Sequence, residues 1–206
     1  MTREPLTIGD PNRRLSLGAG LLMLGLVAGV LLVVRYAFGW VVEHSDEWSL
    51  ASAQRVVADS SLPAPSKAAL KADLERLGAA HAAGKIDYDG LFATLQRVIE
   101  GPFIPAGELE AAATTPGLAA PAQATFRRAG LSLATHDWVP KPVLELCEAL
   151  RAGTPAAELE GRAAEFLAAE VAAPATAEAG YDVVGTFRAL VDATLAGNPP
   201  KRYAPR

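Results

Sequence analysis

The segment IDYDGLFATLQRVIEG, residues 86–101, carries the clearest folding signal in this 206-residue chain. Asp87 is a good helix cap, and Ile86 and Leu91 occupy the two positions of a hydrophobic staple around it. Apolar residues then recur at helical spacing until a Gly-Pro pair, which is typical of a helix end. The segment therefore predicts an amphipathic helix. Its expected buried residues are Leu91, Phe92, Leu95, Val98 and Ile99.

The preceding residues extend this helix to a hairpin. A helix with a single apolar stripe is expected before Gly84, a residue that ends helices in the left-handed conformation. The short connection from Gly84 to Ile86 makes the two helices antiparallel neighbours. An earlier short helix ends at the Pro-rich residues 62–65. The stripes are Leu50, Ala53, Val56 and Val57 in the earlier helix, and Leu70, Leu74, Leu77 and His81 in the hairpin helix.

Residues 102–120 are rich in proline and glycine, which break regular structure. We expect either a linker between two subdomains or a long surface loop within one domain, with a short helix at 108–113. The chain before it, 41–101, then forms juxtamembrane helices and the hairpin. Residues 121–198 form a C-terminal helical subdomain, and 199–206 form a basic tail in solvent.

Helical spacing dominates the C-terminal subdomain as well. Pro121 suits a first helical position, and Gly153-Thr154-Pro155 reads as the end of one helix followed directly by the start of the next. No period-two run indicates a strand. The fold class is therefore all-α, with about six to seven short amphipathic helices after the N-terminal segment. The expected inward residues are Phe126, Ala129 and Leu133; Val143, Cys147 and Leu150; Leu159, Ala163, Phe166 and Leu167; and Val184, Phe187, Val191 and Leu195.

The N-terminal segment LSLGAGLLMLGLVAGVLLVV, residues 15–34, contains no charged residue. At about 1.5 Å per residue, a helix of this length spans the roughly 30 Å hydrocarbon core of a bilayer. Arg35, Tyr36 and Trp40 follow it and suit the membrane interface. We predict a single transmembrane helix within 15–40, held in the lipid bilayer. A cleaved signal peptide is the alternative, but the run is long and its bulky exit suits a peptidase poorly.

Basic residues set the expected orientation. Residues 1–14 contain Arg3, Arg13 and Arg14, whereas acidic residues follow Arg35. Since basic flanks stay cytoplasmic, the short tail is predicted inside and the C-terminal domain outside. Richness in Ala and Pro indicates a high-GC bacterium, so the membrane is the bacterial inner (plasma) membrane.

Gly25 and Gly29 form a GxxxG pattern, which allows two transmembrane helices to approach closely. A homodimer through this helix, contact with another membrane protein, and a small-residue helix without any partner are all open. The protein beyond the membrane has 21 acidic and 15 basic residues from Glu43 onward. With no Lys/Arg cluster, nucleic acid is not an expected partner.

The sequence signals no metal site and no cofactor. The histidines, His44, His81 and His136, lack metal-ligand spacing, and no phosphate-binding loop or nucleophile elbow is present. His136-Asp137 could supply a general base and Cys147 a nucleophile. However, Cys147 is the sole cysteine and lies on an inward stripe, where cysteine serves as a small hydrophobe. An enzyme is therefore not expected.

These observations favour a membrane-anchored, non-enzymatic protein-interaction or scaffold module. One alternative is an accessory subunit of an integral membrane complex, held through the Gly25/Gly29 face. The other is an unrecognised enzyme or ligand-binding domain.

Overall fold

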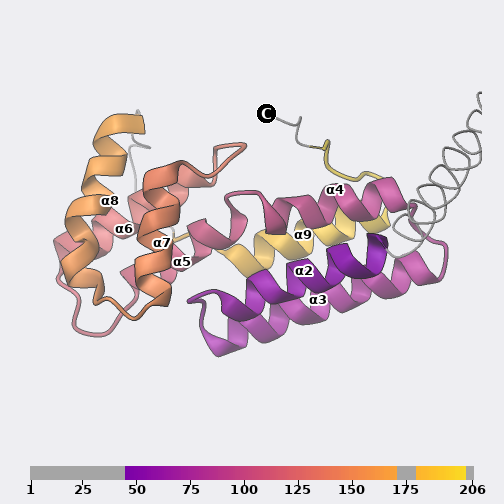
Figure 1. The fold of residues 1–206 in the computed structure, drawn as a ribbon, viewed down its shortest axis with the longest axis horizontal. Helices are drawn as coiled ribbons and strands as arrows, with labels where there is room; N and C mark the ends of the chain where they lie inside the picture. The colour runs from indigo at the N-terminus through magenta and orange to yellow at the C-terminus, as the bar shows by residue number, and fades with distance from the viewer. Residues whose placement is uncertain (1–44, 171–179, 203–206) are drawn as a thin grey trace, which may run out of the picture. The chain divides into compact units, whose positions relative to one another are not determined.

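The computed structural model describes residues 45–170 and 180–202. Within these ranges the chain forms helices and no strands, so the predicted all-α class is confirmed (Figure 1). Residues from Asp46 onward belong to one compact unit. The helices are α2 (Ser45–Asp59), α3 (Ala64–Ala82), α4 (Tyr88–Ile99), α5 (Phe103–Ala113), α6 (Ala120–Leu133), α7 (Lys141–Arg151), α8 (Ala156–Glu170) and α9 (Val183–Leu195).

The predicted cytoplasmic tail, 1–14, and the predicted transmembrane helix, 15–40, lie outside the described residues. Among the helices that are described, none combines the length and the apolar character needed to cross a bilayer.

Local chemistry sets several helix ends where the sequence predicts them. The Asp87 carboxylate accepts a hydrogen bond of 2.8 Å from the Gly90 amide at the start of α4. Gly84 and Gly153 follow α3 and α7 with φ angles of +68° and +84°, a conformation that costs glycine little. These contacts confirm the predicted connections before α4 and before α8.

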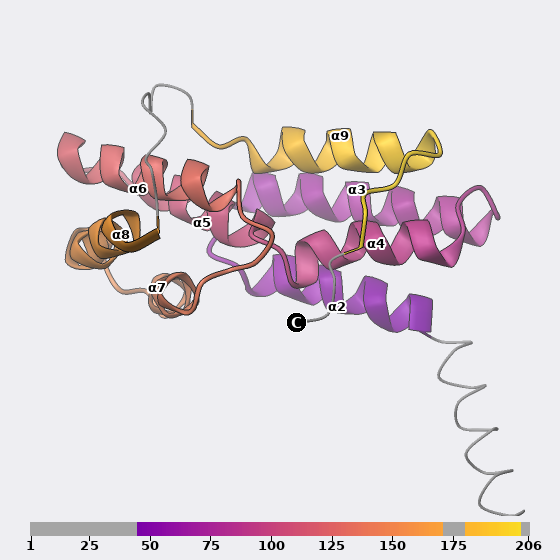
Figure 2. The same cartoon turned by 90° about the horizontal axis from the view of Figure 1, so that it is seen from above.

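The first hydrophobic core joins α2, α3, α4 and α9. Helices α3 and α4 run in opposite directions, as the hairpin prediction requires (Figure 2). The structure differs from the sequence interpretation at α9, which was assigned to the C-terminal subdomain. Its apolar stripe instead packs against α3 and α4. The core residues include Leu70, Leu74, Leu77, Leu91, Leu95, Val98, Phe187 and Val191.

Polar contacts fix α9 on this core. The buried Asp73 carboxylate of α3 accepts hydrogen bonds from Arg76 at 2.8 Å and from Arg188 of α9 at 3.2 Å. The hydroxyls of Thr94 and Thr194 lie 2.7 Å apart and are fully buried between α4 and α9. Since buried polar groups need partners, these contacts favour one register of α9.

The second core joins α5, α6, α7 and α8. The short helix predicted at 108–113 is confirmed, but it begins earlier than expected and is packed into this core, where the sequence predicts a linker or surface loop over 102–120. Residues 103–113 form α5, and eight of its residues are buried. Its proline, Pro105, lies in the first turn, where no intrahelical hydrogen bond is lost. Gly107 allows close contact: a Cβ atom there would lie 2.9 Å from Val183. The proline and glycine that suggest a loop therefore belong to a tightly packed helix.

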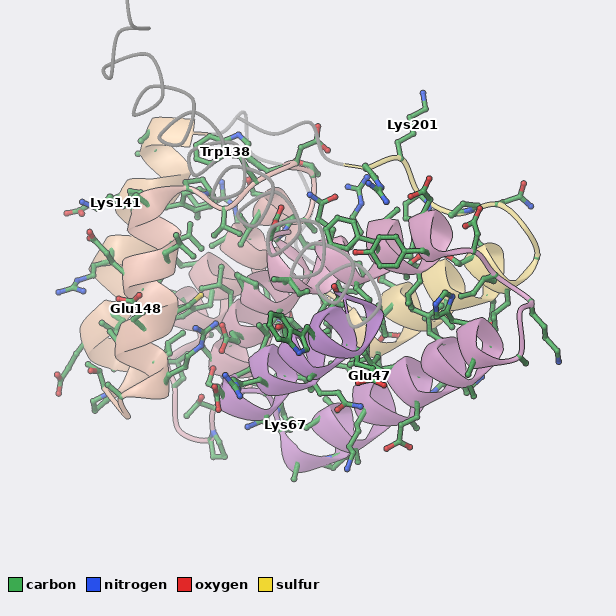
Figure 3. The ribbon with its side chains drawn as sticks, turned by 45° about the vertical axis from the view of Figure 1, so that its right-hand side comes forward. Glu47, Lys67, Trp138, Lys141, Glu148 and Lys201 are labelled. Carbon is green, nitrogen blue, oxygen red and sulfur yellow. The ribbon has the colours of Figure 1, made fainter. Side chains whose placement is uncertain are left out.

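In the described part of the basic tail, Lys201 and Arg202 are exposed, as expected of a solvated end, but they also contact α4. The Lys201 carbonyl accepts a hydrogen bond of 2.7 Å from Arg97 of α4. The Arg202 guanidinium pairs with Asp89 and lies 4.9 Å from the centre of the Phe92 ring. Residues 201–202 are therefore attached to α4, while the Lys201 side chain points outward (Figure 3).

Candidate functional site

An open groove of about 410 Å³ lies between α2, α4, the start of α5 and α7. The connection between α6 and α7 closes one side of it. We call it the α2/α7 groove. It is lined by Val56, Val98, Ile99, Glu100, Gly101, Pro105, Trp138, Val139, Leu144 and Arg151.

Exposed apolar side chains concentrate at this groove. Among the described residues, three large hydrophobic side chains are exposed, and two of them, Trp138 and Leu144, line the groove. Trp138 is 38% exposed and Leu144 is 43% exposed. Figure 3 shows Trp138 on the same side of the molecule as Lys141 and Glu148 of α7. Exposed apolar side chains gathered at one hollow are typical of a binding surface.

Local sequence explains why these two side chains stay at the surface. The α7 stripe that faces the core consists of Val143, Leu146 and Cys147, and Leu144 lies beside it. Trp138 lies just before Pro140, the residue that precedes α7, and its ring contacts His136 edge-on at 6.5 Å. The helix start thus fixes the tryptophan next to the groove.

A buried ion pair lies at the edge of the groove. Glu108 of α5 is fully buried and accepts two hydrogen bonds of 2.7 Å from Arg151 of α7, one on each carboxylate oxygen. The Ser61 backbone N–H, in the connection after α2, donates a third bond of 2.7 Å. Planar bidentate pairing is the strong form of such an interaction. Glu108 therefore links α5 to α7 and to the connection after α2.

The charge of Arg151 is neutralised by this pair. Its hydrogen bonds to Glu108 raise the pKa of the Arg151 guanidinium above its ordinary value, so it stays protonated. Its side chain is 32% exposed and lines the groove, whereas the Glu108 side chain does not reach solvent. The groove therefore has a guanidinium at its edge without a net positive charge.

Glu108 also borders a second hollow, of about 310 Å³, with Ser61, Thr114 and Thr115. Both carboxylate oxygens of Glu108 already accept hydrogen bonds from Arg151. The carboxylate therefore has little capacity to bind a ligand from this side.

The structure gives Cys147 and His136 separate surroundings. Cys147 is fully buried, and burial, followed by the nearby Glu108 charge, raises the pKa of its thiol. A thiol of this kind is a weak nucleophile at neutral pH. His136 Nδ1 lies 3.0 Å from the Ser132 carbonyl oxygen, and its ring is 6.2 Å from Phe166. These contacts hold the imidazole at the end of α6.

The other sites considered from the sequence are structural or lie outside the described residues. His81 Nδ1 lies 3.1 Å from the Ile86 carbonyl oxygen at the end of α3. In the described ranges, no three His, Cys, Asp or Glu side chains are grouped as metal ligands would be. The predicted anchor and helix-packing residues, together with His44, fall before the first described residue; they are Gly25, Gly29, Arg35, Tyr36 and Trp40.

Sequence reasoning missed both the groove and the ion pair. The sequence pattern assigns no role to Trp138, and it places Glu108 in the predicted loop or short helix. One signal was available: Leu144 is a large apolar residue outside the inward stripe of its helix. No family model matches this sequence, and no curated protein or solved structure is significantly similar to it.

Proposed function

We propose that this protein is a single-pass membrane protein whose helical domain is a non-enzymatic interaction module. The observation that carries the proposal is the α2/α7 groove, where Trp138 and Leu144 leave apolar surface exposed at one hollow. The third exposed large hydrophobic side chain of the described residues, Trp48 of α2, does not line the groove. The exposed surface of Trp138 and Leu144 contributes nothing to folding, because it stays in contact with water. A protein partner that covers them would gain by removing this surface from water.

The membrane part of the proposal is supported by the uncharged run at 15–34 and by its basic N-terminal flank. With the tail in the cytoplasm, the helical domain would lie outside the bacterial inner membrane. Two measurements test this part: extraction of membranes with carbonate at high pH, and a topology reporter fused after Arg206. Release by carbonate, or a cytoplasmic reporter signal, would contradict it.

The interaction part is tested by crosslinking in cells. A photo-reactive phenylalanine analogue at Trp138 should form a discrete crosslinked product, identified after capture in mild detergent. The matched control carries the same analogue at Lys85, which is exposed between α3 and α4 and does not line the groove. If the Trp138 position yields no product beyond the Lys85 background, the groove does not meet a partner.

A second candidate, an accessory subunit of an integral membrane complex, is favoured by the GxxxG pattern at Gly25 and Gly29. Exchange of both glycines for leucine would then release the protein from its complex in mild detergent. The groove-based proposal expects the crosslink at Trp138 to persist in that variant.

A further inference from the structure

We infer that the α2/α7 groove binds a cationic, amphipathic peptide segment: one or two bulky apolar side chains flanked by Lys or Arg. This inference deepens the proposed function and rests on it. The charges around the apolar lining of the groove determine which class of partner it favours.

The floor of the groove fits apolar side chains. Val98 is 1% exposed, and Val56, Ile99 and Val139 beside it are half-buried. At about 410 Å³, the groove is near the small end of the range for ligand sites. That space suits one or two large side chains presented by a helix, and it is too small for a whole helix. Recognition of an apolar helix face by a groove is a recurring mode of peptide binding.

The rim of the groove is acidic. Glu100 lines it from the end of α4. Glu148 is exposed on α7, four residues after Leu144 and three before Arg151, so it lies on the helix face that lines the groove. Asp137 precedes Trp138, and its side chain is 81% exposed.

Few cations offset these carboxylates. Arg151 is neutralised by the fully buried Glu108, and Arg97 lies 3.9 Å from Asp137, so neither pair adds a net charge. Lys141, three residues before Leu144, is paired in turn with Glu145 at 3.6 Å. The charges that remain are those of Glu100 and Glu148. The remaining charge at the rim is therefore negative. Because opposite potentials attract and like charges repel across an interface, Lys or Arg on the partner is favoured. An anionic ligand, such as a fatty acid, would place its carboxylate beside Glu100 and Glu148.

The test uses the full chain in nanodiscs of zwitterionic lipid, which does not attract a cationic peptide electrostatically. Two fluorescein-labelled 12-residue peptides share Trp and Leu at i and i+4. One has Lys at the surrounding positions, and the other has Glu. Fluorescence anisotropy measures their binding, with empty nanodiscs as the blank. We expect the Lys peptide to bind at least tenfold more tightly than the Glu peptide.

Three variants assign the binding to the groove. Leu144→Ser and Glu148→Lys should each raise the Kd of the Lys peptide at least fivefold. The matched control, Glu165→Lys, changes the net charge equally on an exposed position of α8 and should shift Kd less than twofold. Protection of Cys147 from alkylation shows that each variant remains folded, since this thiol is fully buried.

Several results would overturn the inference. These are no saturable binding, equal or tighter binding of the Glu peptide, or the same loss of affinity in Glu165→Lys as in Glu148→Lys. If such a result accompanied a discrete crosslink at Trp138 in cells, the assigned partner chemistry would be wrong while the proposed interaction function stood. If the crosslink were also absent, both the assigned partner chemistry and the proposed interaction function would be wrong.

Discussion

Exchange of Arg151 for methionine tests the buried ion pair most directly. The substitution keeps an extended apolar side chain at the end of α7 but leaves the fully buried Glu108 without its cation. Breaking a buried pair by removing one partner costs about 3–5 kcal/mol. Since the Arg151 side chain is 32% exposed, water can reach its position and soften the effect. We therefore expect a loss of about 3 kcal/mol of unfolding free energy.

This loss is large enough to measure easily. With a denaturant slope of about 2 kcal/mol per molar urea, the unfolding midpoint falls by about 1.5 M. The melting temperature falls by about 6–12 °C for a domain of this size. The assay is pulsed alkylation of the full chain in nanodiscs at increasing urea. Cys147 is the sole cysteine and is fully buried, so labelling reports the opened fraction.

Two further variants separate the pair from general effects. Arg162→Met makes the same exchange at an exposed position of α8 and should change stability by about 0.5 kcal/mol or less. Combining Glu108→Gln with Arg151→Met should restore about half of the loss, because a neutral amide oxygen can still accept the Ser61 N–H. If Arg151→Met shifts the midpoint no more than Arg162→Met does, Glu108 is not held as a buried charge.

Three other predictions follow from individual contacts. Above about pH 9 the unfolded chain loses the Cys147 proton while the folded chain, with its raised thiol pKa, keeps it. The free energy of unfolding, measured by circular dichroism, should therefore fall as the pH rises. Its slope should exceed that of the Cys147→Ala variant by up to about 1.4 kcal/mol per pH unit. Thr94→Val should cost about 1 kcal/mol, because it removes the bond between the two hydroxyls while Thr194 keeps its bond of 3.0 Å to the Leu190 carbonyl oxygen. The double valine variant should cost less than the sum of the two single variants, since both lose the same bond. Gly130→Ala should destabilise the protein by about 1–3 kcal/mol in urea titrations, since its Cβ would lie 2.9 Å from a backbone oxygen of α5. The matched control, Gly161→Ala, has open space around it and should stabilise the protein by about 0.5–1 kcal/mol. The cysteine prediction fails if Cys147→Ala shows the same pH slope as the unchanged protein. The threonine prediction fails if the costs of the two valine variants are additive. The glycine prediction fails if both alanine variants change stability in the same direction.

The helix ends were predictable because their causes lie within a few residues. Asp87 bonds to an amide three residues later, and Gly153 adopts its left-handed conformation directly after α7. The apolar stripes of α4 and α7 likewise follow from spacing alone. An apolar stripe predicts which face of a helix is buried, but it does not predict which other helix that face packs against. For that reason α9 was assigned to its sequence neighbours, although it packs against α3.

The second half of α5 is predicted as the short helix at 108–113, but its first half could not be recognised, because Gly and Pro occur both in loops and in closely packed helices. Gly107 and Pro105 are typical loop residues by composition. In the structure the glycine lets α5 approach Val183 and Leu62, and the proline occupies the first helical turn. Which of the two roles applies depends on neighbours far away in the sequence. The local sequence pattern therefore does not show that the helix begins at Phe103.

The candidate site was hidden for a related reason. Glu108 and Arg151 are 43 residues apart, and each resembles an ordinary surface charge in the sequence. Only the packing of α5 against α7 brings them together and removes the carboxylate from water. Trp138 and Leu144 likewise become a shared surface only when the start of α7 is placed beside α2 and α4.

The position of α5 connects the two cores to the groove. Ile104 of α5 belongs to the core formed with α2, α3, α4 and α9, whereas Leu109 belongs to the core formed with α6, α7 and α8. The walls of the α2/α7 groove come from both groups, α2 and α4 on one side and α7 on the other. Glu108 bonds to segments from each group, through Ser61 and Arg151. Displacement of either wall would break hydrogen bonds of this buried carboxylate, which costs free energy. The ion pair therefore favours one separation of the groove walls.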